Sequence, residues 1–137
     1  MTEERKQSLH PISSVLCQVY RTLYVKGEVS FPITDDNIEK IDTIVKTVYS
    51  SYFGITRFST EEEQASVFFC LIIKDHPMID GNKRLAVLWL QVFCDAFNLK
   101  IESKIPLDEL AVSVESEKKI DIDELYFLIR RILFTKV

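Results

Sequence analysis

The feature that most constrains the fold is a pair of strongly apolar segments separated by a polar stretch. Residues 67–73 and 85–97 are apolar over nearly their whole length, and a helix that is apolar on all sides is buried on most of them. Pro77 and Gly81 interrupt the pattern, because proline disfavours a helical conformation at the residue before it and glycine accepts strained conformations. The sequence therefore predicts two central buried helices, at about 61–74 and 83–97, joined by a loop.

Periodic patterns predict further helices on both sides of this pair. Apolar residues recur every three or four positions, the spacing of one helical face, in four other segments. These segments are 12–25, a stretch from Asp35 or Asp36 that runs through Val48 and ends by Gly54, a short one near 107–114, and a last one at about 123–134. The sequence therefore predicts an all-α bundle.

Local signals predict how these helices begin. Asp35 or Asp36 should cap the second helix with its side chain. Ser59 or Thr60 should open a capping box with an acidic residue three positions later, and Asp121 with Glu124 has the same spacing. The segment Phe53–Phe58, which is β-branched and aromatic, predicts a short extended excursion or hairpin before the first central helix.

Composition limits the class of protein. A chain of 137 residues with 47% apolar residues predicts a single domain over residues 1–137. Its net charge of −4 gives no global attraction for a polyanion, so nucleic acid is a poor candidate partner. Cys17, Cys70 and Cys94 are odd in number and far apart, which indicates buried free thiols in a reducing cytoplasm. The N-terminus has no apolar signal core and no apolar run is long enough to span a bilayer, so we expect a soluble protein that binds no membrane.

The loop between the central helices holds the densest group of chemically capable side chains. Histidine is the one side chain that ordinarily changes its charge near neutral pH, so His76 is the candidate base that takes a proton from an attacking hydroxyl. Asp80 offers a carboxylate suited to Mg²⁺, which commonly binds one or two carboxylates together with substrate phosphates.

The second half of the loop is suited to an anion. The backbone N–H groups of Gly81, Asn82 and Lys83 precede a helix and can converge on a phosphate at the positive end of its dipole. Lys83 and Arg84 add charge, and Arg84 can donate two parallel hydrogen bonds to phosphate oxygens. Each residue also has an ordinary structural explanation, as a turn, a cap or a solvated charge. The combination nevertheless favours phosphoryl or nucleotidyl transfer.

The segment His76-Pro77-Met78-Ile79-Asp80-Gly81-Asn82-Lys83-Arg84 resembles the signature of the Fic/Doc family, His-x-Phe-x-(Asp/Glu)-(Gly/Ala)-Asn-x-Arg. Only Met78 departs from a defining position. The resemblance extends through both central helices and more loosely to the helix at 120–134, whereas residues 1–30 match weakly. It implies a Fic-like helical bundle with a short extended flap before the motif helix.

The resemblance also implies roles for the loop residues. These are general base for His76, Mg²⁺ ligand for Asp80, anion-hole residues for Gly81 and Asn82, and phosphate clamp for Arg84. Family members dock the target polypeptide as an added strand on the flap, and the matching residues here are Gly54, Ile55, Thr56 and Arg57. A plain interhelical loop is the alternative for that segment.

Two departures from the signature bear on the reaction. Met78 replaces a phenylalanine that plugs the core beneath the loop, and because methionine is apolar and adaptable we expect this change to loosen the loop without abolishing it. Lys83 stands where members that transfer AMP usually have glycine, and a side chain there resembles the Doc toxins, in which a nucleoside triphosphate gives up its terminal phosphate. We therefore favour phosphoryl transfer over AMP transfer (AMPylation), with ATP and Mg²⁺ as co-substrate and cofactor and a protein hydroxyl as acceptor.

Three alternatives concern activity and its control. The family's self-inhibitory pattern is only partly matched, by Ser59…Glu63 and Ser113…Glu117, so we expect any inhibition to come from a separate antitoxin-like partner of a toxin–antitoxin pair. A Fic-fold binding or regulatory module without turnover is the second possibility. The third is a purely structural bundle in which the loop is incidental. Nucleotide binding that depends on Mg²⁺ would separate an enzyme from a scaffold.

Overall fold

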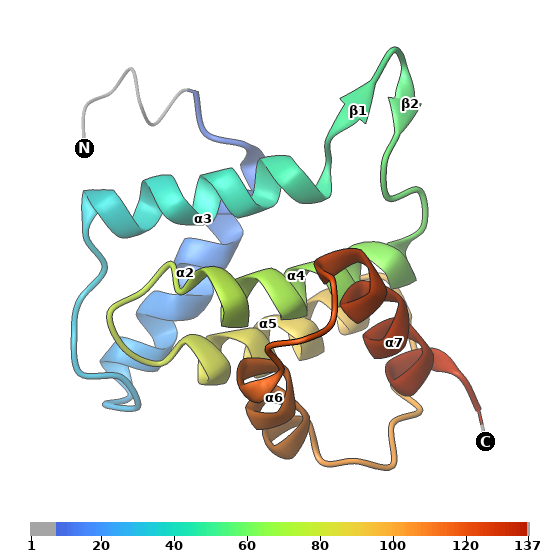
Figure 1. Cartoon of the computed structure of the whole chain (residues 1–137). Coiled ribbons are helices and arrows are strands. Elements are labelled where there is room, and N and C mark those ends of the chain that lie inside the picture. The colour runs from blue at the N-terminus through green and yellow to red at the C-terminus, as the bar shows by residue number, and fades with distance from the viewer. Residues whose placement is uncertain (1–7, 137) are drawn as a thin grey trace.

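The structure, a computed structural model, describes residues 8–136 and is mostly helical in that part of the chain (Figure 1). The elements are α2 (Pro11–Val25), α3 (Asp35–Val48), β1 (Ser51–Tyr52), β2 (Ile55–Thr56), α4 (Glu61–Asp75), α5 (Asn82–Ala96), α6 (Leu107–Ser116) and α7 (Ile122–Phe134). The prediction of an all-α bundle with a short flap before the motif helices is confirmed.

Helix α4 is the centre of the bundle. It packs against α5, α7, α3 and α6, and α2 packs against α3 and α5. The side chains from Ala65 to Ile73 are buried all round the helix, as the apolar run predicts. Trp89 and Phe93 of α5, each 2% exposed, pack with Phe68 of α4 at ring-centroid distances of 5.4 and 5.5 Å. The two apolar segments therefore form the buried core.

The helix ends follow the sequence with some corrections. Thr34, rather than Asp35 or Asp36, caps α3, because its hydroxyl accepts the N–H of Asn37 while the Asn37 side chain accepts that of Thr34. Thr60 caps α4 as expected, because its hydroxyl accepts the N–H of Glu63, but the Glu63 carboxylate accepts from that same hydroxyl and the capping box is not completed. Asp121 precedes α7 without a side-chain cap, so that capping box does not form.

The predicted excursion before α4 is a hairpin. Helix α3 ends at Val48, and Ser51 and Tyr52 pair antiparallel with Thr56 and Ile55. Phe53 and Gly54 both have positive φ and form the turn. Figure 1 shows this hairpin projecting beside the N-terminus of α4, whereas the α4–α5 loop lies at the other end of that helix.

The three predicted free thiols are confirmed. Cys17, Cys70 and Cys94 are all buried and unpaired. Burial raises the pKa of each thiol, to about 12 for Cys70, and therefore suppresses thiolate reactivity. In residues 8–136, no helix is long and apolar enough to cross a membrane.

Candidate functional site

The site begins where α4 ends. His76 follows the last residue of α4 in a left-handed conformation, with φ 47° and ψ 62°, and its side chain is exposed. Pro77 excludes continuation of the helix at this point. The sharp turn places the imidazole at the wall of a cavity rather than in the core.

The loop is held from beneath by buried polar side chains. Asn82 accepts the N–H of Met78 and donates to its carbonyl, both at 2.9 Å. Asn37 of α3 donates to the Pro77 carbonyl at 2.9 Å. Met78 is 4% exposed, so its side chain fills the core beneath the loop. The Asn82 side chain thus braces the loop, and only its backbone N–H remains to face an anion.

Gly81 is the N-cap residue immediately before α5, and no larger residue fits there. Its φ is +80°, and a Cβ built on it would lie 2.3 Å from Cγ1 of Val29. Both the backbone conformation and the close approach therefore require glycine. With glycine at this position, the N-terminus of α5 lies against the loop that joins α2 to α3.

The α2–α3 loop, residues 26–34, holds the motif through two hydrogen bonds. The Ser30 N–H donates to Oδ2 of Asp80 at 3.1 Å, and the Arg84 guanidinium donates to the Glu28 carbonyl. The Tyr20 hydroxyl anchors the loop in turn by donating to the Phe31 carbonyl at 2.7 Å. Sequence reasoning missed this loop, because its contacts are mainly backbone groups that leave no residue pattern.

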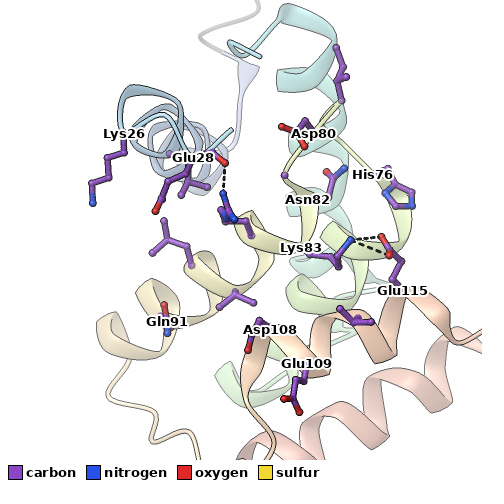
Figure 2. Close-up of a pocket in the computed structure, with 17 residues that line it drawn as sticks. Lys26, Glu28, His76, Asp80, Asn82, Lys83, Gln91, Asp108, Glu109 and Glu115 are labelled. Atoms are coloured by element: carbon purple, nitrogen blue, oxygen red, sulfur yellow. Dashed lines mark hydrogen bonds and ion pairs between the residues drawn. The ribbon is translucent and has the colours of Figure 1, made fainter. Parts of the chain in front are cut away.

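The opposite wall is α6, which reaches the motif through an ion pair. Nζ of Lys83 donates to both carboxylate oxygens of Glu115, at 3.1 and 3.0 Å (Figure 2). The hydrogen bond from Lys83 holds the pKa of the Glu115 carboxyl below its usual value, with nearby positive charge adding to the effect. Both side chains are partly exposed, at 41% and 38%. This ion pair therefore links α5 to α6 at a partly solvent-exposed position and not in the core.

The cavity between these walls has a volume of about 1000 Å³. Three cationic side chains and a larger number of carboxylates line it. The cations are Lys26, Lys83 and Arg84, and the carboxylates are Glu28, Asp80, Asp108, Glu109 and Glu115. Because the carboxylates outnumber the cations, the wall alone does not neutralise a polyphosphate, and a divalent cation would offset the remaining repulsion.

Asp80 could bind such a cation only if a bound substrate supplied further metal ligands. One of its oxygens accepts from Ser30, which leaves Oδ1 free to bind a metal, and the residue is partly exposed at the cavity. No group of three or more His, Cys, Asp or Glu side chains within residues 8–136 could hold a metal by itself. Mg²⁺ is usually bound by one or two carboxylates, with substrate phosphates and water completing its shell, so the lone Asp80 carboxylate would suit it only when a phosphate lies beside it.

All six motif residues predicted as functional line this one cavity, namely His76, Asp80, Gly81, Asn82, Lys83 and Arg84. The hairpin residues Gly54 to Arg57 do not. They lie at the N-terminus of α4, whose 15 residues span about 22 Å before His76 is reached. Arg57 is engaged there with α7, at 3.2 Å from Asp123.

The fold and the site together define a helical domain with a polar, cavity-lining loop between its two central helices. The sequence model of the Fic/DOC family matches residues 11–94, which is more than half of the chain. The chain belongs to the Fic/DOC family. The match starts at the beginning of α2, so it includes a helix that the loop signature alone did not reach. Neither the curated proteins nor the solved structures contain a match to the chain.

Proposed function

We propose that this protein transfers the terminal phosphoryl group of a nucleoside triphosphate, ATP being the expected donor, to a hydroxyl of a target protein. The family supports a transferase of the Fic type in general. The observation that carries the proposal is that His76, the Asp80 carboxylate and the N-terminus of α5 share one cavity. A base, a metal-binding carboxylate and an anion-binding helix end are the groups that phosphoryl transfer uses.

The proposed reaction is a direct displacement. The acceptor oxygen forms a bond to the γ-phosphorus while the bond from that phosphorus to the β-phosphate oxygen breaks, so that ADP leaves. His76 takes the proton of the hydroxyl. The N–H groups at the start of α5 and the Arg84 guanidinium hold the phosphate oxygens. Mg²⁺ bound at Asp80 would neutralise charge that develops on the phosphates.

Lys83 supports the choice of the terminal phosphate. Its side chain extends from the first turn of α5 across the cavity to Glu115. A side chain at this place reduces the room beside the anion site, which transfer of AMP would need for the α- and β-phosphates. AMP transfer, with attack at the α-phosphorus and release of pyrophosphate, is the alternative.

A second candidate is a binding or regulatory module without turnover, and one observation favours it. Asp80, Lys83 and Arg84 are each engaged with a protein group, on Ser30, Glu115 and Glu28 respectively. A nucleotide would have to replace or share these contacts. If the protein is an active enzyme, these contacts would be those of the state without substrate. Inhibition would then come from a separate antitoxin-like protein acting in the cytoplasm.

The target polypeptide would dock on the hairpin as an added strand. Support comes from its short unpaired edges and from the exposure of Tyr52 and Ile55, at 62% and 73%. The hairpin is about 22 Å from His76 along α4. At about 3.3 Å per extended residue, the modified hydroxyl would lie roughly seven residues from the docked strand.

The test is incubation of the protein with cell lysate, Mg²⁺ and ATP labelled at either the α- or the γ-phosphate. We expect protein-bound label from γ-labelled ATP only, and Lys83→Gly should lower it. Label from α-labelled ATP with the unchanged protein would mean AMP transfer. Nucleotide binding without any label transfer would favour the binding module.

A further inference from the structure

Ile79 is an exposed apolar side chain on the motif loop. It is 67% exposed, whereas Pro77 and Met78 just before it are buried. Ile79 belongs neither to the hydrophobic core nor to the partly buried side chains packed against it. It nevertheless lines the same cavity as His76 and Asp80. An exposed isoleucine stabilises little until another apolar group covers it, so the stability of the fold does not account for this residue.

A second exposed apolar side chain, Phe31, comes from the α2–α3 loop, which runs along the motif in the opposite direction. Three contacts join the two segments, namely those of Glu28 with Arg84, Val29 with Gly81 and Ser30 with Asp80. Continued by one residue, this antiparallel order places Phe31 opposite Ile79. Phe31 is 46% exposed and, like Ile79, is neither in the core nor packed against it. The order of contacts therefore puts two exposed apolar residues side by side at the edge of the cavity.

Hydrogen bonds fix the backbone next to both residues. The Asn82 side chain bonds both the N–H and the carbonyl of Met78, which precedes Ile79. The Tyr20 hydroxyl donates to the carbonyl of Phe31 at 2.7 Å. A side chain on a fixed backbone loses little conformational freedom when it is covered, and the β-branched isoleucine has few rotamers to lose. The pair is therefore suited to binding another apolar group.

The position of the pair indicates which reactant would cover it. In the chain, Ile79 lies between His76 and Asp80 and before the N–H groups that begin with Gly81, and Figure 2 shows the His76 and Asp80 side chains at the same end of the cavity. A hydrocarbon side chain offers no hydrogen bond to the phosphates of a nucleotide. The acceptor polypeptide, in contrast, must bring its hydroxyl to His76 and carries side chains on either side of it. The Asp80 carboxylate would repel an acidic one.

A second copy of this chain is a poorer occupant. Stable dimers bury about 800 Å² on each partner, over roughly 20–30 residues. Two side chains supply only a small part of that area, whereas they match one or two side chains of an extended polypeptide.

We propose that Ile79 and Phe31 select the acceptor, by contacting an aliphatic or aromatic side chain within about two residues of the hydroxyl that is modified. Docking on the hairpin acts through backbone hydrogen bonds and distinguishes no side chain near that hydroxyl. The pair therefore decides which serine, threonine or tyrosine of a docked segment reaches His76. This inference rests on the proposed function, because it assumes transfer to a protein hydroxyl.

The experiment measures label transfer from γ-labelled ATP with Mg²⁺ over a series of lysate dilutions. The variants are Ile79→Thr and Phe31→Gln, with Ile79→Leu and Phe31→Leu as conservative replacements. Ile105→Thr and Phe127→Gln are the matched controls, since these residues are 41% and 57% exposed and lie outside the cavity. Calorimetric titration of each variant with Mg²⁺–ATP reports the donor separately, and mass spectrometry locates the labelled residue.

The expected loss concerns the acceptor only. Ile79→Thr and Phe31→Gln should each transfer about fivefold less label at low lysate concentration, because an apolar contact is lost. The loss should shrink as the lysate concentration rises, since it lies in the KM for the acceptor rather than in kcat. The leucine variants and the controls should transfer label like the unchanged protein, and all variants should bind Mg²⁺–ATP with the same affinity. The labelled residue should have an apolar neighbour within about two positions.

Several outcomes overturn the inference while the proposed function stands. One is equal label transfer by the unchanged protein, Ile79→Thr and Phe31→Gln. Another is a labelled residue that has only polar or charged neighbours. A loss of Mg²⁺–ATP affinity in these two variants would place their effect on the donor instead. A dimer in analytical ultracentrifugation that either variant dissociates would mean that a second copy covers the pair.

The failure of the proposed function has a different signature. If the unchanged protein transfers no label from γ-labelled ATP at any lysate concentration, the transfer itself is absent, and the selection of an acceptor fails with it.

Discussion

At the scale of single residues, His76 combines its proposed role as the base with an unusual backbone conformation. Its φ of 47° lies in the left-handed region, where asparagine is better tolerated than alanine. This conformation decides which substitution tests the base cleanly, since an alanine would disturb the loop as well as remove the imidazole.

We expect His76→Asn to abolish phosphate transfer while leaving nucleotide affinity and thermal stability close to those of the unchanged protein. Asparagine accepts the left-handed conformation but has no group that takes a proton near neutral pH. Label transfer from γ-labelled ATP measures the first property, and titration with Mg²⁺–ATP measures the second. Turnover near the original rate would show that another group is the base.

Gly81 supports a second prediction at this scale. Gly81→Ala should destabilise the protein by roughly 2–3 kcal/mol, because alanine is strained at φ +80° and its Cβ would overlap Val29. Val29→Ala removes the overlapping methyl group but not the backbone strain. The double variant should therefore be more stable than the sum of the two single effects by about 1 kcal/mol, measured by urea denaturation. Strict additivity would mean that the contact with Val29 is unimportant.

At the scale of the elements, Asp42 joins the start of α2 to the middle of α3. Its Oδ1 accepts from the Ser13 hydroxyl at 2.6 Å and from the His10 N–H at 3.1 Å, and Lys46 pairs with Oδ2 at 2.8 Å. Burial raises the pKa of this carboxyl, but the hydrogen bonds from Lys46, Ser13 and His10 outweigh it and the pKa is lowered. This carboxylate helps to fix α2, which carries the loop that holds Asp80 and Arg84.

Asp42→Ala should destabilise the fold by about 2–4 kcal/mol, because it leaves buried donors without an acceptor. Asp36→Ala is the control, since Asp36 forms an exposed pair with Lys40 that should contribute about 0–1 kcal/mol. Urea denaturation of both variants gives the comparison.

The effect of Asp42 should also depend on pH. A lowered pKa in the folded state means that the stabilisation is present above the ordinary value of 3.8 and is lost as the pH falls through the lower value of the folded protein. The stability difference between the unchanged protein and Asp42→Ala should therefore shrink below about pH 4. A difference that stays constant down to pH 2 would contradict the lowered pKa.

The elements also show what the sequence could and could not predict. Apolar periodicity was sufficient to predict the helices. The nine-residue pattern from His76 to Arg84 was sufficient to identify the motif residues that line the cavity. The role of residues 28–30 was not predictable, because Glu28 and Ser30 act through backbone groups and contact residues that lie 56 and 50 positions later in the chain. The position of the hairpin could have been inferred, since a full helix separates Arg57 from His76.

At the scale of the whole molecule, ligand binding should stabilise the fold in a way that depends on Mg²⁺. At a nucleotide concentration 100 times its Kd, mass action contributes about 2.7 kcal/mol, or roughly 10 °C in Tm for a domain of this size. Asp80→Asn should lose most of the increment that Mg²⁺ provides, because the amide still accepts from Ser30 but no longer carries charge. Thermal denaturation with ATP, with and without Mg²⁺, measures it. An equal shift in both conditions would remove Asp80 from the metal site.

The two walls of the cavity come from distant parts of the chain, and this has a consequence for its synthesis. The ribosome produces α4, the motif loop and α5 before α6, which begins only at Leu107. A nascent chain that stops before that residue has the motif loop but lacks the cavity wall that carries Val112 and Glu115. Its loop would face water on that side. We therefore expect the transferase to remain silent during translation until α6 has been made and has packed against α5, so that an unfinished chain cannot modify the cell that is producing it.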